Sequence, residues 1–588
     1  MTRSSQVFTK FFMSLICITL TAGCMHTKTQ SSFSPDMATA SKTYAPIPST
    51  LSGSYLAGRF AQQQQDWDNA FHYMSQALAL SDTSEHNTLL DRTFLLALGN
   101  AEIKNAELLA DKIIERNSQA DIAFIFKSSL AFKNLDYKGA QETLDKIDQK
   151  QFGSYTIPLL QAWIKAAEGE TGSAIDILNK SEYKQDSVYV LHKALMYDIA
   201  DDPKAETLYE DALRQGMTLH ETLIAANYFE RHNKTDLAQS IYDAIYNQDP
   251  HSPFVAEGFK RIKTGVMPPK TIAEADDGLV FALFSMASLL YERQAYDSAL
   301  IYCRIIENLQ PEKGFINLMI GDILALTGNY SGSIEHYRRI EKEDILFKMA
   351  QLRTVEVLDR ASRTSEALDM LSVIAEQDSM RLEALTYIGD IYQRQNRFDL
   401  ALEAYDRAIT TLGDRVSPQH WSLIYARGMS YERLNNWSSA EKDLLHALEY
   451  QPENPHILNY LGYSWVEKGV NLDRAMDMIR KAVVLKPNDG FIIDSYGWAF
   501  YKKGQFEDAV YWLERAVELV PDDANLNDHL GDAYWQMNRE KEARFQWRRA
   551  YKLSSDQSQK NQIGQKLKNG LKKQPMQNVA AKREAALH

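Results

Sequence analysis

Few side chains in this sequence have the types and spacing that catalysis would need. Ser439 and Lys442 have Ser-x-x-Lys spacing, in which a lysine amine can take the proton of a serine hydroxyl, and Ser181 and Lys184 repeat it. So short a pattern arises by chance in a chain of this composition. The sequence has no His-Glu-x-x-His, no Gly-x-Ser-x-Gly, no phosphate-binding glycine loop and no cysteine cluster. We therefore expect a protein that is not an enzyme and holds no metal and no cofactor.

The elements that position the remaining side chains follow a repeat of about 34 residues. Gly497 is followed three residues later by Phe500 and twelve residues later by Ala509. The same phase returns at Gly389, Gly428, Gly462 and Gly531, and in weaker copies at Ala287, Gly321 and Val355. A small residue, an aromatic residue and an alanine in this register resemble a tetratricopeptide repeat.

Each repeat is expected to be two antiparallel amphipathic helices that approach closely at the small residues. One pair cannot bury its apolar face, whereas a stack of pairs buries a continuous core. Alanines in the more degenerate amino-terminal half indicate six further pairs, at Ala70, Ala106, Ala140, Ala174, Ala205 and Ala238. The sequence thus predicts an all-α, tetratricopeptide-repeat superhelical solenoid of about fourteen helix pairs.

Interruptions of the period predict the domain organisation. Pro268 and Pro269 lie in a stretch that breaks the repeat, and Ile563, Leu567 and Leu571 are spaced as on one face of a final helix. We expect a lipoprotein signal peptide at 1–23, a lipid anchor and flexible tether at 24–50, a degenerate amino-terminal array at 51–251, a linker at 252–278, a carboxy-terminal array at 279–553, and a capping helix with a basic tail at 554–588.

The charge distribution argues against one class of partner. The 588-residue chain has a formal net charge of −13, yet residues 556–588 hold seven Lys and Arg against two Asp and Glu. The tail is therefore +5 and the rest of the chain −18. An acidic body without a broad basic stripe predicts no nucleic-acid partner. The tail could contact phosphate or an acidic polymer, or could be a solvated final helix.

The first residues have the architecture of an export signal. A basic start precedes an apolar run over residues 11–20, and the end Ala22-Gly23-Cys24 resembles a bacterial lipoprotein signal. That resemblance implies cleavage before Cys24 and lipidation of its thiol, although Thr21 stands where Leu is usual. Ordinary cleaved secretion and an uncleaved anchor are the alternatives. Met25 after the cysteine implies sorting to the outer membrane, and Cys303 is then the only unmodified cysteine, so no intramolecular disulfide can form.

Function is then expected on a surface. In tetratricopeptide arrays the first helix of each pair lines the concave face, chiefly at positions 2, 5, 9 and 12 when the small residue is position 8. The candidate partner-binding residues at these positions are Tyr425, Asn459, Tyr463, Phe491, Asp494, Trp498, Tyr501, Asp528, Asp532 and Trp535. Aromatic side chains offer large contact area to a protein or peptide partner. Tyr463 and Trp498 could instead pack against the next repeat. Because these positions hold no cationic clamp, a basic or polar-aromatic partner fits them better than an acidic carboxy terminus.

The carboxy-terminal repeats also resemble one known family. The stretches NYLGYSWVEKGVNLDRAM, DSYGWAFYKKGQFEDAVYWLERAVEL and NDHLGDAYWQMNREKEARFQWRRA are similar to repeats of long tetratricopeptide lipoproteins of proteobacteria. That family includes outer-membrane lipoproteins that bind periplasmic carboxy-terminal processing serine proteases and promote cleavage of their substrates. The resemblance implies a membrane-anchored periplasmic adaptor that brings such a protease and its substrates together. The alternative is an assembly factor for envelope machinery such as pili, secretion systems or outer-membrane protein insertion.

Overall fold

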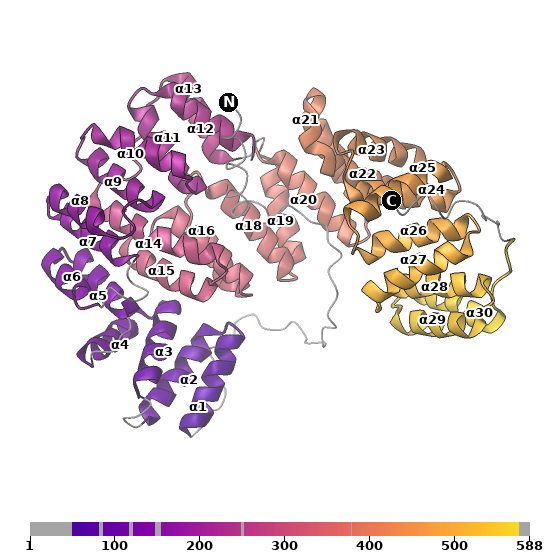
Figure 1. Cartoon of the computed structure of the whole chain (residues 1–588), viewed down its shortest axis with the longest axis horizontal. Coiled ribbons are helices and arrows are strands. Elements are labelled where there is room, and N and C mark those ends of the chain that lie inside the picture. The colour runs from indigo at the N-terminus through magenta and orange to yellow at the C-terminus, as the bar shows by residue number, and fades with distance from the viewer. Residues whose placement is uncertain are drawn as a thin grey trace. The chain divides into compact units, whose positions relative to one another are not determined.

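The structure, a computed structural model, describes residues 50–81, 86–116, 121–147, 155–248, 252–377 and 379–575. The expected signal peptide, Cys24, nearly all of the tether and the last thirteen residues of the basic tail lie outside these ranges and stay predictions. The described residues form 30 α-helices and no strand (Figure 1). The predicted all-α fold is confirmed.

The chain divides into two compact units, one up to Arg363 and one from Thr364. Unit 1 contains α1 (Leu51–Gln63), α2 (Trp67–Leu80), α3 (His86–Gly99), α4 (Ile103–Glu115), α5 (Asp121–Lys133), α6 (Tyr137–Leu144), α7 (Ile157–Ala167), α8 (Thr171–Lys180), α9 (Ser187–Ile199), α10 (Lys204–Gln215), α11 (Leu219–Arg231), α12 (Thr235–Tyr246), α13 (Pro253–Thr264), α14 (Ala275–Glu292), α15 (Tyr296–Leu309), α16 (Gly314–Leu326), α17 (Tyr330–Arg338) and α18 (Phe347–Arg360).

Unit 2 contains α19 (Thr364–Ala375), α20 (Arg381–Arg394), α21 (Phe398–Leu412), α22 (Trp421–Arg433), α23 (Trp437–Tyr450), α24 (Pro455–Lys468), α25 (Leu472–Leu485), α26 (Gly490–Lys502), α27 (Phe506–Leu519), α28 (Ala524–Gln536), α29 (Glu540–Leu553) and α30 (Gln557–Asn569), with two short 3-10 helices between α21 and α22. The final helix packs on α29, and its Ile563 is fully buried, as a capping helix requires.

The helix pairs share one kind of turn. Between the two helices of each pair stands a residue with left-handed backbone, with φ between +50° and +89°. These residues are Gln65, Ala101, Leu135, Gly169, Asp201, Asn233, Gln294, Gly328, Ser362, Asn396, Asn435, Asn471, Gly504 and Asn538. The described residues thus hold fourteen such turns and fourteen pairs, of which α18 and α19 fall in different units. The predicted number of pairs is confirmed.

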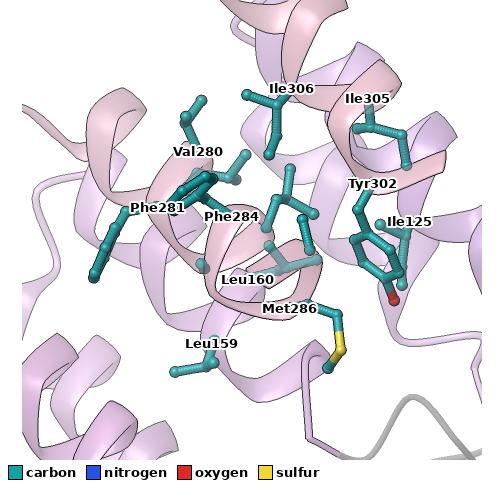
Figure 2. Packing of buried hydrophobic residues seen from close by; sticks show 14 of the residues in the cluster. Ile125, Leu159, Leu160, Val280, Phe281, Phe284, Met286, Tyr302, Ile305 and Ile306 are labelled. Carbon is teal, nitrogen blue, oxygen red and sulfur yellow. The ribbon is translucent and has the colours of Figure 1, made fainter. Parts of the chain in front are cut away.

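The interior of unit 1 is filled by its own chain. Helix α14 packs against α7 and α9, and α15 packs against α3 and α5, so these two helices line the inner side of the amino-terminal repeats (Figure 1). Figure 2 shows part of this buried apolar cluster, which includes Val280, Phe281 and Phe284 of α14 and Leu160 of α7. Burial of such apolar surface is the main force that holds α14 and α15 against the earlier repeats.

A close approach at Gly278 fixes the position of α14. A Cβ atom at this residue would lie 2.3 Å from the indole ring of Trp163 on α7. The indole N–H of Trp163 donates a hydrogen bond of 2.8 Å to Nδ1 of His192, whose ring packs on Phe281. Burial lowers the pKa of His192 to about 3, so the imidazole is neutral and can accept this bond.

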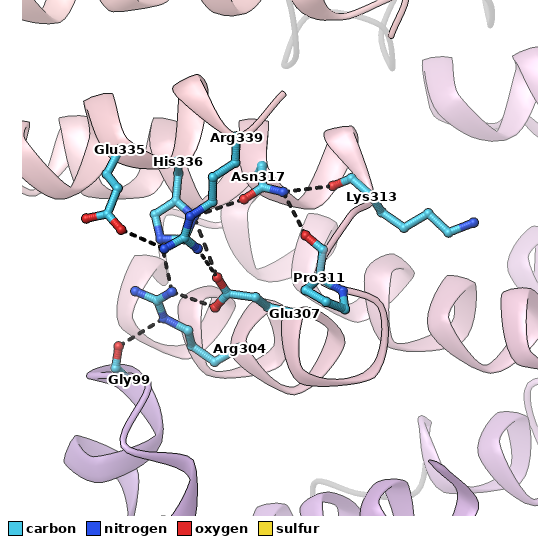
Figure 3. Close-up of polar contacts among 9 residues, drawn as sticks. All are labelled: Gly99, Arg304, Glu307, Pro311, Lys313, Asn317, Glu335, His336 and Arg339. Carbon is cyan, nitrogen blue, oxygen red and sulfur yellow. Dashed lines mark hydrogen bonds and ion pairs between the residues drawn. The ribbon is translucent and has the colours of Figure 1, made fainter. Parts of the chain in front are cut away.

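A polar network holds α15 to α3. The guanidinium of Arg304 donates from Nε to the backbone oxygen of Gly99, 3.1 Å away, and from Nη1 to Glu307 and to His336 (Figure 3). His336 in turn donates from Nδ1 to Asn317 of α16. Burial, with the charges of Arg304 and Arg339, lowers the pKa of His336 to about 3. The buried arginine therefore meets a carboxylate and a neutral imidazole, and its charge is satisfied.

The structure describes the segment expected as a linker and the apolar stretch that follows it. The segment expected as a linker, 252–278, holds α13, which packs on α12, and the first residues of α14. The division of the chain falls later, after Arg363. The physical reason is that α14 and α15 bury their apolar faces on the amino-terminal repeats rather than only on the repeats that follow. No described helix has the length and hydropathy to cross a bilayer, and that includes α14.

The left-handed turn at Leu135 predicts a stabilising substitution. A leucine with φ of +63° carries strain from its Cβ, and its side chain is 69% exposed, so Leu135→Gly should raise the stability of unit 1 by about 0.5–1 kcal/mol. Leu108→Gly is the matched control, because Leu108 is 62% exposed within helix α4 and should lose about 1 kcal/mol. Urea unfolding followed by circular dichroism measures both. Equal losses in both variants would contradict the strained turn.

The close contact between Gly278 and Trp163 predicts a destabilising substitution. Gly278→Ala should push α14 away from Trp163 and lower the free energy of unfolding of unit 1 by roughly 1–3 kcal/mol. Gly172→Ala in α8 is the control, since a Cβ there meets no atom within 4 Å and alanine favours the helix by up to about 1 kcal/mol. If both alanine variants unfold at the same or a higher urea concentration than the wild type, the close packing of α14 is wrong.

Candidate functional site

The candidate residues lie on the first helices of four consecutive pairs in unit 2: α22, α24, α26 and α28. Each first helix approaches its partner at the repeat glycine. A Cβ at Gly497 would lie 2.7 Å from Leu513 of α27, and one at Gly531 would lie 2.4 Å from Trp547 of α29. Glycine is required there because the partner's side chain occupies the space of a Cβ.

The aromatic side chains of α26 form a stack inside the unit. The rings of Trp498 and Tyr501 are parallel within 5°, with centroids 4.5 Å apart. The imidazole of His529 on α28 also stacks on Trp498, with ring centroids 4.0 Å apart. Trp498 is 8% exposed and Tyr501 5% exposed, and the indole N–H of Trp498 donates to Glu467 of α24. The expectation that these two rings face a partner is wrong, because they fill the space between neighbouring repeats.

The acidic side chains are also engaged within the unit. Asp494 is buried and accepts a hydrogen bond of 2.9 Å from His529, and Asp528 and Asp532 lie 2.7 Å and 2.8 Å from Nζ of Lys566 on α30. Burial raises the pKa of Asp532 to about 6, although Lys566 opposes the shift. Each of these aspartates, predicted to bind a partner, thus pairs with a basic side chain of the same unit.

Asp532 belongs to a structural pattern that recurs. Its carboxylate accepts from the indole N–H of Trp547, and Asp322 and Asp390 likewise accept from Tyr337 and Tyr405, in each case fifteen residues along the chain. Each of these aspartates directly follows the glycine that makes room for the ring. A Gly-Asp pair with an aromatic residue on the second helix is therefore a packing signal, which was present in the sequence.

The chain's own tail covers Trp535. The indole N–H of Trp535 donates to the backbone oxygen of Leu571 at 2.7 Å. The side-chain amide of Gln536 donates to the backbone oxygen of Lys572 at 3.1 Å. The backbone N–H of Gln574 donates back to Gln536 at 3.0 Å. Residues 570–575 form no helix, and Trp535 is thus part of a contact with the carboxy-terminal segment.

Apart from Asp528, which is partly buried and pairs with Lys566, four candidate residues keep solvent access: Tyr425 on α22, Asn459 and Tyr463 on α24, and Phe491 at the start of α26. Asn459 and Tyr463 are four residues apart and so share one face of α24. The side-chain oxygen of Asn459 is buried and has no hydrogen-bond partner. We call Tyr425, Asn459 and Tyr463 the α22–α24 surface.

Sequence reasoning missed one aromatic residue beside this surface. Tyr460 packs edge-to-face on Tyr425 at 5.9 Å and donates its hydroxyl hydrogen to Glu432 of α22 at 3.1 Å. It occupies position 6 of its helix, outside the four positions used for the prediction. The helical periodicity of α24 could have revealed it, because Tyr460 directly follows Asn459, and a long side chain next to a concave-face position can reach the adjacent helix.

The two units differ in how their inner helices are covered. In unit 1, α14 and α15 lie on the inner helices α3, α5, α7 and α9. Among the described parts of unit 2, α22 and α24 have substantial contacts only with neighbouring elements along the array. The α22–α24 surface is therefore an uncovered stretch of inner helix that carries aromatic and amide groups.

Comparison with known proteins identifies the repeats. Models described as tetratricopeptide repeat match residues 352–415 and 425–490, and a TPR repeat model matches 497–538. Tetratricopeptide repeats bind proteins. The chain is 30% identical over 164 residues, 28% of its length, to the TPR repeat-containing protein PA4667 of Pseudomonas aeruginosa, and the match spans 27% of that relative.

Solved structures with a similar arrangement have low overall agreement. The Cut9–Hcn1 hetero-tetramer of APC/C matches 89% of this chain and 97% of its own at 14% identity, with a TM-score of 0.36. MamA from Desulfovibrio magneticus RS-1 matches 29% of this chain and 94% of its own at 17% identity, with a TM-score of 0.26. The repeat models and the helix pairs, rather than these scores, support a tetratricopeptide solenoid and a scaffold for protein–protein interaction.

The pair of Asp494 and His529 predicts a pH-dependent stability. Burial opposes the charged imidazole, but the carboxylate of Asp494, with help from Asp528 and Asp532, outweighs it and raises the pKa of His529. A raised pKa stabilises the folded state fully below about pH 6.5, and this contribution is lost as the pH rises through the folded pKa. Asp494→Asn should therefore cost most stability near pH 6 and least near pH 9, as measured by urea unfolding.

Asp477→Asn is the control for this experiment. Asp477 pairs with Arg480 on the exposed side of α25, and arginine stays charged over the same pH range. Its effect on unfolding should be small and should not change with pH. A cost of Asp494→Asn that is constant from about pH 6 to about pH 9 would contradict a charged His529.

Proposed function

We propose that this protein is a periplasmic scaffold, held at the outer membrane by a lipid on Cys24, that brings a carboxy-terminal processing protease and its substrates together. The observation that carries the proposal is the α22–α24 surface, an uncovered stretch of the inner helices in the region that resembles protease-binding lipoproteins. Both of its tyrosines are half-buried against the core of unit 2, and Tyr425 packs edge-to-face on Tyr460, so they are held in place before a partner binds. Pre-ordered aromatic side chains lose little entropy on binding, which favours affinity.

The chemistry of the surface favours a partner segment with donor groups. The carboxylates of Glu432 and Glu467 lie on the same two helices as Tyr425, Asn459 and Tyr463. Glu432 accepts from Tyr460 and Glu467 accepts from Trp498, and each carboxylate can accept further hydrogen bonds from amide N–H groups or basic side chains of a bound segment.

The tether supports the proposal by its length and its anchor. A lipid on Cys24 would leave about 26 residues before α1, and a chain of this length spans some tens of ångströms. Protease and substrate bound near one membrane-held scaffold would meet at a raised effective concentration. An assembly factor for pili, secretion or outer-membrane protein insertion would use the same surface with different partners, and identification of the bound protein separates the two functions.

Replacing the two tyrosines of the α22–α24 surface tests the proposal. Tyr425→Ala with Tyr463→Ala should weaken capture of the processing protease or its substrates from envelope extracts by at least about ten-fold, because interface aromatics commonly contribute about 2 kcal/mol or more. The same variant should fail to accelerate cleavage when purified protease and substrate are mixed with it. Thermal unfolding checks that the variant is folded.

Tyr511→Ala is the matched control, since Tyr511 is 61% exposed on the second helix α27. It should retain capture and acceleration. Cys24→Ala should retain binding but leave the membrane fraction. If the double variant retains every partner of the wild type, the surface is not the binding site; if wild-type protein captures only pilus, secretion or insertion components, the assembly role replaces the adaptor role.

A further inference from the structure

A cavity of about 470 Å³ lies within unit 1, where the first repeats meet the inserted helices. Its walls come from α1, α2, α3 and α5 on one side and from α14 and α15 on the other. It exists because α15 packs closely on α3 and α5 but leaves a gap beside α1 and α2. Cavities of this size between packed elements commonly hold small ligands or peptide side chains.

One wall of the cavity is apolar. It includes Leu96, Ile125 and Ile301, together with the ring of Tyr302, which lies beside Ile125 in Figure 2. All four side chains are buried to at least nine-tenths. Such a wall suits an aliphatic side chain, which would be removed from water on binding.

The lining of the cavity also carries hydrogen-bond donors whose capacity is not used. Nε1 of Trp67 and Nη1 of Arg92 are buried and have no hydrogen-bond partner, and the side chain of Trp67 is only 7% exposed. Arg59 of α1 also lines the cavity, and its Nη1 donates to Gln62 at 2.9 Å. A buried donor without an acceptor costs free energy, which a bound acceptor would recover. Two guanidinium groups with an indole N–H form a set of donors typical of carboxylate recognition.

The lining of the cavity holds hydrogen-bond acceptors as well. The carboxylate of Asp297 lines the cavity and accepts from the side chain of Gln65, and the Gln65 oxygen itself is buried without a partner. Asp121 lines the cavity as well. An acyl chain of a fatty acid has no donors for these groups. A peptide main chain has amide N–H groups for them, next to its terminal carboxylate.

We propose that this cavity binds the free carboxy terminus of a peptide whose last residues are aliphatic. The terminal carboxylate lies between Arg59 and Arg92, the indole of Trp67 donates to it, and the aliphatic side chain packs on Ile125 and Ile301. A main-chain N–H group of the peptide donates to the carboxylate of Asp297. The site belongs to unit 1 and does not involve the α22–α24 surface, so its test is independent of the proposed adaptor function.

Fluorescence polarisation with the intact protein tests this site. The probe is fluorescein-Gly-Ala-Ala-Leu-Val with a free carboxylate, and the competitors are the unlabelled acid, its carboxy-terminal amide and dodecanoate. The acid should compete at least about ten-fold better than the amide, because the amide removes a charge that meets two arginines. Arg92→Gln should weaken the probe by a similar factor, and Arg92→Lys should restore part of the binding.

Two further variants keep the result interpretable. Trp67→Phe removes the indole N–H but keeps an aromatic ring, and should weaken binding while the protein stays folded by thermal unfolding. Arg116→Gln, at an exposed arginine after α4, is the control and should bind the probe as the wild type does. No probe binding at millimolar peptide, equal competition by acid and amide, or tighter Arg92-dependent binding of dodecanoate would each overturn the proposal.

Discussion

The close approach of two helices at one glycine is the interaction on which the rest of this protein depends. In several pairs a ring or branched side chain of the second helix occupies the place of the missing Cβ, as Tyr337 does at Gly321 and Tyr405 at Gly389. This contact sets the distance within a pair, and only then can the aligned faces of successive pairs stack into a continuous core. The aspartate after the glycine completes the contact by accepting the hydrogen of the ring's hydroxyl or N–H.

The same packing rule has opposite consequences in the two units. In unit 1 the inner side of the early repeats is closed by α14 and α15, which are themselves helices of a later pair. The α22–α24 surface of unit 2 stays uncovered by the described helices of that unit, apart from its neighbours in the array. A protein of one repeat type can thus contain a filled interior, which leaves a small cavity, and an uncovered face, which leaves room for a larger partner. Each of these features suits a different ligand.

The regular part of this fold could be predicted from the sequence, and the departures from regularity could not. Glycines about 34 residues apart identify helix pairs because each repeat has the same spacing of small, aromatic and alanine residues. The packing of α14 on α7 and α9 joins residues far apart in the chain, such as Gly278 and Trp163, which are more than a hundred residues apart, and it has no period. Counting positions along the repeat likewise placed Trp498 and Asp532 on a partner surface. It could not show that His529 stacks on Trp498 or that Lys566 pairs with Asp532, because these contacts come from neighbouring helices. Tyr425, Asn459 and Tyr463 keep solvent access because their neighbours leave one side uncovered.

Hydrogen exchange at increasing urea measures the central claim, that α14 and α15 are part of the core of the amino-terminal repeats. The slowest amides of α3, α5, α7 and α9 should open together with those of α14 and α15, at one urea dependence. Amides of α22 to α29 should follow a separate dependence, since they belong to the other unit. Exchange of α14 and α15 at low urea, while α3 to α9 remain protected, would contradict the account.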